Sequence, residues 1–359
     1  MNQKINEKTF NGQSIYVGID VHKKDWKITV MTESILYKTF SAPPEAEKLS
    51  SYLTEHFPGA EYYSAYEAGF SGFWAHRELI KLGIKSIVVN PADIPTTDKE
   101  RKQKEDRRDS RKIAQTLRSG QLKGIHVPTE KTQLDRGLLR CRESIVKDLS
   151  RTKNRMKGFL YFHGITYPPQ FDSKNSHWSN KFFEWLESIT LPFESAKSHL
   201  EAYLSSAKHY RSLLLRVTRQ IRELSKSPEY KENVDLLMSV PGIGILTAMT
   251  VLLELENINR FENFSRLCSY VGLIPSTHSS GEKTVDTGIT SRKNSRLRAA
   301  LVESAWVAIR NDPALLASYQ NLKKRIPGNR AIIRIAKKLL NRMLFVLRKR
   351  EKYEKGIIK

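Results

Sequence analysis

Cysteine is scarce in this chain, and its two residues, Cys141 and Cys268, are too few to build a disulfide framework. No closely spaced Cys and His residues accompany them, so a structural zinc site is not expected. Long apolar runs are missing too, since the longest, around Ile245 to Leu253, falls far short of the roughly 18 to 20 residues that span a bilayer. The opening segment MNQKINEKTFNGQ has no apolar stretch typical of a signal peptide. We therefore expect a reducing, cytoplasmic location and no membrane partner.

Acidic residues are few relative to basic ones. The 359 residues include 38 Asp and Glu against 61 Lys and Arg, which gives a net charge of +23. Such an excess indicates a polyanionic partner, with nucleic acid as the first expectation. A merely basic soluble protein stays open as an alternative, because charge alone specifies no chemistry. The length is sufficient for two or three domains.

The first hundred residues have the pattern of an α/β domain. The segment IYVGIDVHKKDWKITV predicts a strand, a polar turn at His22 to Lys24 and a second strand, because β-branched residues are enriched in it. A third strand is expected at residues 35–42, and helix and strand patterns then alternate up to residue 92. Three successive strands followed by this alternation are the order of an RNase H-like sheet, although a generic mixed sheet also fits.

The rest of the chain has mainly helical patterns. Residues 99–120 are highly charged, contain no Pro or Gly before Gly120, and predict a helix. Long helices are expected at 131–157 and 182–225, on either side of the break YPPQFDSKNS. We expect them to pair as a coiled coil or hairpin, or else to pack as a bundle within one chain, because no strict heptad persists. From Asn233 onward, helices alternate with loops.

Two acidic residues stand at or near predicted strand ends. Asp20 lies in an apolar, strand-like run, where a bound metal ion would offset the desolvation of its charge. The alternative is that Asp20 simply begins the turn before His22. Glu67 ends the strand EYYSAYEAG and precedes a glycine by two positions.

Two more acidic residues, Asp106 and Asp109, follow on the predicted helix. Their spacing places both on one helix face, with Cβ atoms about 5 to 6 Å apart. Because eight Lys and Arg lie between Lys99 and Lys112, a solvated charged face explains this pair equally well. The four carboxylates together favour a site for Mg²⁺ (or Mn²⁺), in which two ions about 3.5 to 4 Å apart assist in-line attack on phosphate. Basic residues beside the cluster would offset the phosphate charge: Arg107, Arg108 and Arg111.

Two further motifs lie in the last third of the chain. In the turn Pro-Gly-Ile-Gly, Gly242 and Gly244 would present backbone N–H groups to a phosphate in a helix-hairpin-helix contact, or would simply join two helices. The later segment IPSTHSSGEKTVDTGITSRKN is polar and predicts a loop. On pattern alone, Ser279 and Ser280 are ordinary turn residues in it.

Taken in order, these motifs resemble the insertion-sequence one-ten family of DEDD transposases. The matching pieces extend from Tyr16 to about Arg350 and are GIDVHKKDW, AYEAG, KEDRRDSRKIA, SVPGIG, LxSYVGLIP, SSGEK and GIT. The resemblance implies a RuvC-like metal domain at residues 1–130, a coiled-coil assembly region at 131–232 and a mainly helical transposase domain at 233–359. It also implies donor and target DNA as substrates, a guiding bridge RNA and a homo-oligomer, either a dimer or a tetramer.

The resemblance also assigns residues. It implies that Asp20, Glu67, Asp106 and Asp109 hold the metal ions, and that Ser280 attacks the DNA backbone and becomes covalently linked to it, with Ser279 as the second choice. We expect the metal pocket to receive the Ser280 loop from the same or a neighbouring subunit. Nucleic-acid contacts are expected from Arg107, Arg108, Arg111, Gly242, Gly244, Lys283, Arg292 and Lys293.

The chain departs from the family pattern at two points. It has Glu105-Asp106 where the family usually has Thr-Asp, and its turn at Ser291 to Asn294 lacks the glycine of Lys-x-Gly-Asn. The second departure bears on the shape of the loop after the serine. Two other functions fit parts of the pattern: a metal-dependent RuvC-like junction resolvase or nuclease that forms no serine adduct, and a non-catalytic nucleic-acid-binding protein.

Overall fold

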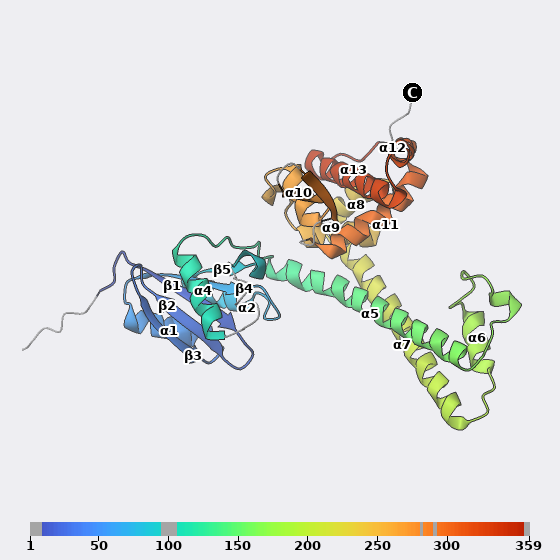
Figure 1. Ribbon diagram of the computed structural model, residues 1–359, viewed down its shortest axis with the longest axis horizontal. Helices are drawn as coiled ribbons and strands as arrows, with labels where there is room; N and C mark the ends of the chain where they lie inside the picture. Colours follow the sequence, from blue (N-terminus) through green and yellow to red (C-terminus); the bar gives the residue numbers. More distant parts are fainter. Residues whose placement is uncertain (1–8, 95–105, 281–282, 290–292, 355–359) are drawn as a thin grey trace, which may run out of the picture. The chain divides into compact units, whose positions relative to one another are not determined.

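A computed structural model describes residues 9–94, 106–280, 283–289 and 293–354 (Figure 1). For residues 106–108, 275–280 and 283–289 it describes the backbone but not the side chains. The chain divides into two compact units, residues 1–128 (unit 1) and 129–359 (unit 2). The predicted regions 131–232 and 233–359 both lie in unit 2, and their separate roles stay a prediction.

Unit 1 is a five-stranded sheet with helices on both faces. Its strands are β1 (Ser14–Val21), β2 (Trp26–Met31), β3 (Leu36–Ala42), β4 (Glu61–Glu67) and β5 (Lys85–Val89). Its helices are α1 (Ala46–His56), α2 (Trp74–Lys81), the short η1 (Pro91–Asp93) and α4 (Asp106–Arg118). The predicted hairpin, third strand and alternating helices and strands are all present. The mixed α/β unit is compatible with the RNase H-like domain that the strand pattern predicts.

The order of the strands in the sheet is β3-β2-β1-β4-β5. The pairs β3-β2 and β2-β1 are antiparallel, whereas β1-β4 and β4-β5 are parallel. Alternate residues of β1, such as Ile15 and Ile19, are fully buried in a core that includes Leu49 of α1 and Leu79 of α2. The opposite face packs against α4, whose Ile113 joins a smaller core. Because β1 is central, both of its faces are covered.

Gly18 sets how closely α4 approaches the sheet. A Cβ atom at Gly18 would lie 2.1 Å from the backbone oxygen of Ser110 and 2.4 Å from the backbone nitrogen of Ala114. The hydroxyl of Ser110 also bonds to Thr29 of β2 at 2.9 Å, in a buried contact. A larger residue at position 18 would therefore push α4 away from the strand that carries Asp20.

Unit 2 is built around two long helices, α5 (Glu130–Phe162) and α7 (Glu194–Leu224), which run antiparallel and side by side (Figure 1). The side chain of Thr129 begins α5 by accepting a hydrogen bond from the backbone of Thr132. At their far end, η2 (Pro169–Phe171) and α6 (Asn180–Ser188) complete a small core with Phe159 and Leu204. The pair matches the expected helical hairpin, and a coiled-coil geometry stays a prediction.

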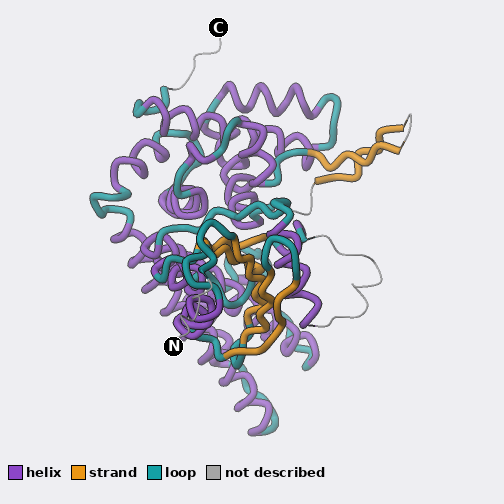
Figure 2. Tube along the Cα trace, turned by 90° about the vertical axis from the view of Figure 1, so that its left-hand side faces the viewer, coloured by secondary structure: helices purple, strands orange, loops and turns teal. Residues whose placement is uncertain are grey.

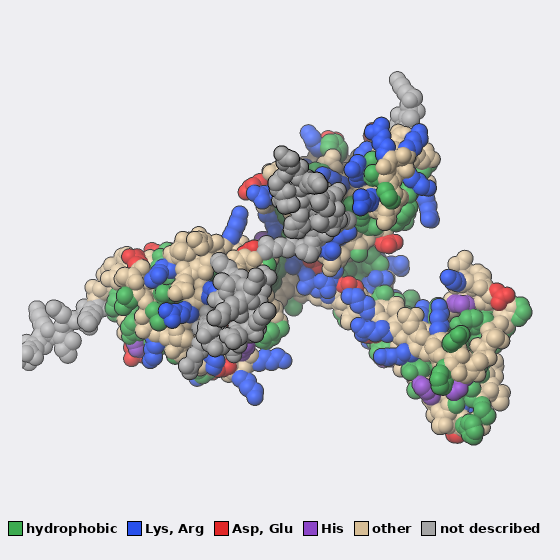
Figure 3. Space-filling model, viewed as in Figure 1, with side chains coloured by type: hydrophobic (Ala, Val, Ile, Leu, Met, Phe, Trp, Pro, Cys, Tyr) green, Lys and Arg blue, Asp and Glu red, His purple; other side chains and the backbone are tan. Residues whose placement is uncertain are grey.

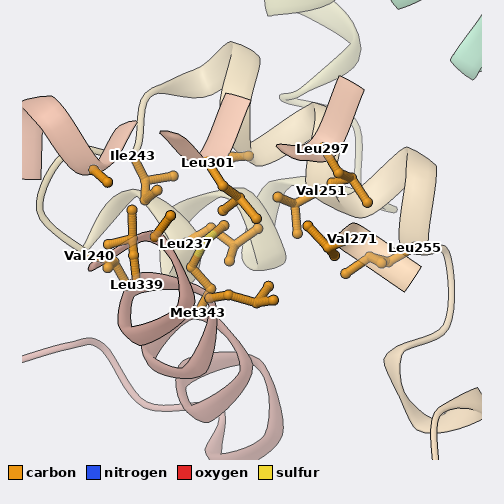
Figure 4. Packing of buried hydrophobic residues seen from close by; sticks show 14 of the residues in the cluster. Leu237, Val240, Ile243, Val251, Leu255, Val271, Leu297, Leu301, Leu339 and Met343 are labelled. Atoms are coloured by element: carbon orange, nitrogen blue, oxygen red, sulfur yellow. The ribbon is translucent and has the colours of Figure 1, made fainter. Parts of the chain in front are cut away.

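The other end of the helical pair, with Ile145 of α5 and Ile221 of α7, belongs to a larger core (Figure 4). Its helices are α8 (Lys231–Met238), α9 (Ile245–Leu255), α10 (Phe264–Val271), α11 (Ser295–Asn311) and α13 (Gly328–Lys349), with η3 (Ile258–Arg260) and α12 (Pro313–Lys323) beside them. Leu237, Leu301 and Leu339 come from α8, α11 and α13 and meet in this core. Neither thiol forms a disulfide, and Cys268 lies in this same core.

Unit 2 differs from the prediction at three places. The expected helix at 182–225 is interrupted after Ser188, because Pro192 separates α6 from α7. An unpredicted helix, α12, begins at Pro313, where Asp312 caps it by accepting a hydrogen bond from Leu315. The expected polar loop instead contains two antiparallel strands, β6 (Pro275–Ser280) and β7 (Lys283–Ile289). In β7, β-branched residues outweighed the polar, Gly-containing composition that suggested a loop.

Within the described ranges, the helices are all too short or too polar to cross a membrane.

Gly18→Ala should destabilise unit 1 by about 3 kcal/mol or more, since the added methyl group meets backbone atoms of α4 that cannot rotate away. Chemical denaturation followed by circular dichroism would measure the loss. Gly69→Ala is the matched control in the same unit, because nothing lies within 4 Å of its Cβ position, and its effect should stay within about 0.5 kcal/mol. Equal stability of the two variants would contradict the close contact described here.

Candidate active site

Asp20 lies near the end of β1, in the hairpin that joins it to β2. The side chain is 22% exposed, and its Oδ2 atom lies 3.0 Å from Nε2 of His22. The hairpin is closed by a hydrogen bond from the backbone N–H of His22 to the carbonyl of Asp25. Asp20 is thus a partly buried carboxylate with one oxygen toward a histidine, in a position fixed by the paired strands.

Glu67 is the last residue of β4, the parallel neighbour of β1. In the register of these strands Gly18 pairs with Ala65 and Ile19 with Tyr66, so Asp20 and Glu67 come next, side by side. Because side chains alternate along a strand, Asp20 shares the face of Gly18, and Glu67 that of Ala65. This is the face that α4 covers. The register therefore brings the first two predicted carboxylates to one edge of the sheet.

The other two predicted carboxylates belong to α4. Asp109 is half-buried and directly precedes Ser110, the residue that contacts Gly18 and Thr29. Asp106 is the first residue of the helix, one turn before Ser110. The side chain of Asp106 lies outside the described residues, as do those of Arg107 and Arg108, whereas Arg111 is exposed.

A metal ion fits the chemistry of this edge, since carboxylate oxygens are the ligands that hard divalent cations prefer. Among the described side chains, however, no three or more His, Cys, Asp or Glu residues are close enough to hold an ion together. The side chain of Asp106 is not among those described. Asp20 and Glu67 are brought together by the strand register, and the closure of the full set stays a prediction.

The candidate serines lie in unit 2, at the end of β6. In the hairpin register Ser279 pairs with Thr284 and Ser280 with Lys283, at the end remote from the helices. The two strands stand out from the helices of unit 2 (Figure 2). The side chains of Ser279, Ser280 and Lys283 and the whole of Arg292 lie outside the described residues.

The base of this hairpin is held by close contacts. Gly272 ends α10 with a φ of +82°, and a Cβ atom there would lie 2.5 Å from Cβ of Lys293. The backbone N–H of Asn294 donates to the carbonyl of Tyr270 at 2.8 Å. The chain therefore leaves and re-enters the helical core at neighbouring points. Lys293 itself is exposed.

A buried acid that sequence reasoning missed anchors this base. Glu254 of α9 is 4% exposed and accepts hydrogen bonds from Arg140 of α5 at 3.1 Å and from the side-chain amide of Asn294 at 2.9 Å. The Oδ1 atom of Asn294 also caps α11 by accepting from the N–H of Leu297. Glu254 is a lone charge in the apolar run ILTAMTVLLEL, and that was the signal available in the sequence. Its partners lie 40 and 114 residues away.

The Pro-Gly-Ile-Gly turn joins α8 and α9 as predicted. Gly242 has a φ of +86°, and a Cβ atom there would lie 2.5 Å from the carbonyl oxygen of Ser304 in α11. Packing against α11 therefore accounts for this glycine. Gly244 is exposed and begins α9 with no atom within 4 Å of its Cβ position. A phosphate contact at this turn stays a prediction.

Two family models match the chain. The transposase model of the DEDD type in IS110 elements matches residues 17–164, which include Asp20, Glu67, Asp106 and Asp109. The model described as the transposase IS116/IS110/IS902 family matches residues 234–320, which include Glu254, Ser280 and Asn294.

Several proteins of known name are similar to the chain. The y4qE protein of Sinorhizobium fredii, which bears a transposase name, is 33% identical over 68% of this chain and 58% of its own length. The transposase for insertion sequence element IS1533 of Leptospira borgpetersenii is 28% identical over 82% of this chain and 85% of its own. The transposase for IS1111A of Coxiella burnetii is 27% identical over 68% of this chain and 64% of its own. The chain thus spans between about three fifths and most of the length of these relatives.

Asn294→Ser should destabilise unit 2 by about 1.5 to 3 kcal/mol, because serine still caps α11 but cannot reach the charged Glu254 carboxylate. Denaturant unfolding of the full chain would measure the change. Asn263→Ser is the matched control: Asn263 caps α10 in the same way, and serine replaces asparagine as a cap at a cost of only a few tenths of a kcal/mol. An equal loss in both variants would show that the bond to Glu254 contributes nothing.

Proposed function

The chain belongs to the IS110 family of transposases, and from this premise we propose that it cuts and rejoins DNA through a covalent bond between a serine and the DNA backbone. Ser280 is the proposed nucleophile. Asp20, Glu67, Asp106 and Asp109 are the proposed ligands of the divalent ions that assist the reaction. The main support is the register that sets Asp20 and Glu67 side by side, under the helix that begins at Asp106.

The proposed reaction is a transesterification. The Ser280 oxygen attacks phosphorus, a Ser–O–P bond forms, the bond from phosphorus to one deoxyribose oxygen breaks, and the serine proton ends on that released oxygen, which becomes a hydroxyl. Attack by a hydroxyl of another strand reverses these steps and joins the new partner. The phosphodiester bond is exchanged for a phosphoserine bond and is not hydrolysed. Because its bond energy is kept in this way, rejoining needs no external energy source. A serine hydroxyl is weakly nucleophilic at neutral pH and needs activation.

The anchored hairpin supports a role for Ser280. Its base is held between α10 and α11 by Gly272, Asn294 and Glu254, so the strands leave the core in a defined direction. The family turn after the serine has a glycine that this chain lacks. Asn294, at the position of the Asn in that turn, makes both the cap of α11 and the bond to Glu254, which supports a fixed point at which the chain returns from the hairpin to the helices.

Divalent ions are proposed as cofactors because all four residues offer carboxylate oxygens. A bound Mg²⁺ or Mn²⁺ would stabilise negative charge on phosphate oxygens of the DNA. The strands of unit 1 fix where Asp20 and Glu67 stand, and Gly18 keeps α4 close enough for Asp109 to lie over the same sheet face.

The remaining parts of the proposal concern partners. Donor and target DNA are the proposed substrates, and the net charge of +23 supports a polyanionic partner. A bridge RNA that pairs with both DNAs, and assembly as a dimer or tetramer, rest on the family resemblance. In such a system base pairing, rather than side chains, would select the sequence.

Ser280→Ala should abolish the protein–DNA adduct that survives denaturation, with recombination falling roughly a thousandfold or more. The adduct would be detected on a denaturing gel with labelled DNA. Ser279→Ala is the matched control, one residue away in the same strand, and should keep the adduct. The opposite pattern would move the assignment to Ser279, and cleavage by the unaltered protein without any adduct would replace the proposal by a metal-dependent nuclease.

Asp20→Asn should weaken Mn²⁺ binding and lower strand cleavage by about a hundredfold or more, because the amide keeps the shape of the side chain but removes a charged oxygen ligand. Electron paramagnetic resonance of added Mn²⁺ would follow binding independently of cleavage. Asp25→Asn is the control, since Asp25 lies in the same hairpin and bonds to Lys27. Unchanged Mn²⁺ binding by Asp20→Asn would remove Asp20 from the metal site.

A further inference from the structure

The end of unit 2 carries a basic surface whose charged residues, from Lys323 onward, lie outside both family matches, which end at residues 164 and 320. Residues 313–350 contain eleven Lys and Arg and no Asp or Glu. The helices concerned are α12 and α13. An excess of this size over 38 residues is unlike the mixed charges of the rest of the chain, and it calls for a polyanionic partner.

The basic residues of α13 lie along one face of the helix. Arg330, Arg334 and Lys338 follow at intervals of four residues and are exposed, and Arg348 and Lys349 extend the stripe. From Arg330 to Lys349, nineteen residues further along, this stripe reaches about 28 Å, at 1.5 Å of rise per residue. Figure 3 shows Lys and Arg side chains gathered over the region of α12 and α13. Lys323, Lys324 and Arg325, at the end of α12 and just after it, are exposed as well.

These charges are not used to hold the fold together. Arg330, Arg334, Arg348 and Lys349 form no ion pair with a described residue, and Lys338 donates to the neutral hydroxyl of Ser318. Arg342 and Arg350 are the contrast: Arg342 points inward and pairs with the buried Asp312, and Arg350, just after the helix, pairs with Glu232. The outward residues are therefore available to a ligand.

The opposite face of α13 excludes a membrane surface as the partner. Its apolar residues, among them Ile332, Ile335 and Leu339, are buried in the core of unit 2. A basic amphipathic helix binds a lipid surface by inserting its apolar face, and this one is already occupied. Only the charged face of α13 can make contact.

The chemistry of the charged face favours a duplex over a single strand. Recognition of single-stranded nucleic acid usually uses aromatic side chains as stacking platforms. Phe345 is the one exposed aromatic residue in α13. A row of Arg and Lys with a single exposed aromatic residue beside it offers at most one stacking platform, and suits the phosphates of a duplex, which need charge and not stacking.

We propose that the exposed face of α13, with the adjoining end of α12, binds the phosphate backbone of duplex DNA and contributes affinity without reading sequence. This rests on the proposed function only in taking DNA as the substrate. The residues of this surface are distinct from the proposed metal ligands and from the proposed nucleophile. Its role is to hold DNA and not to cut it.

The test is the salt dependence of binding by the full chain. In Arg330→Gln/Arg334→Gln/Lys338→Gln, the slope of log affinity against log salt concentration for a DNA duplex should become less steep, its magnitude falling by about 2 to 3, since each lost phosphate contact contributes about 0.9. The matched control is Lys147→Gln/Lys208→Gln/Lys226→Gln, which removes the same charge from unit 2 at residues already paired with Glu143, Glu187 and Glu223. Its slope should change by less than about 1.

Three results would overturn the inference: an unchanged slope in the α13 variant, an equal fall in the control, or a fall seen with duplex or single-stranded RNA but not with duplex DNA. Thermal unfolding of both variants shows that the helices are intact. Binding is measured without cleavage, so the two proposals can fail separately. A protein that binds DNA through α13 but forms no serine adduct would contradict the proposed function and would still support this inference.

Discussion

The distance between α4 and β1 is the constraint on which the acidic edge of unit 1 depends. With no side chain at Gly18, the backbone of the turn from Ser110 to Ala114 can rest directly on the strand. The same device recurs in unit 2, where Gly242 faces the turn from Ser304 to Ala308. In both places a glycine meets a helix turn that begins with Ser and ends with Ala. The hydroxyls bond to a threonine in each case, Ser110 to Thr29 and Ser304 to Thr247.

Much of the fold could be predicted from local patterns. The strand that contains Asp20 is rich in β-branched residues and the strand that ends at Glu67 is rich in tyrosine, while the long helices have apolar stripes over many turns, so each signal was repeated several times. The elements that the sequence did not predict are short. Asp312-Pro313 is a compact start signal inside what looked like a loop between two helices, and β7 alternates over only seven residues.

The site could be predicted less completely, for a physical reason. Asp20 was recognisable because a charge in a strand is costly and must be offset locally. Glu254 is equally costly, but its partners Arg140 and Asn294 come from other helices, and no spacing in the sequence pairs them. Gly242 was open to two interpretations for the same reason, since the carbonyl of Ser304 that excludes a side chain there lies 62 residues further along. Contacts between distant segments leave little trace in a single sequence.

The two faces of α13 differ in how freely their residues can be exchanged during evolution. Its inward residues are committed to the core, while its outward ones touch no described acid and add little to folding. Exchanges at outward positions usually alter the free energy of unfolding by less than about 0.5 kcal/mol. Substitutions along this one helix face can therefore raise or lower affinity for a polyanion, while the free energy of unfolding and the residues proposed for catalysis stay unchanged.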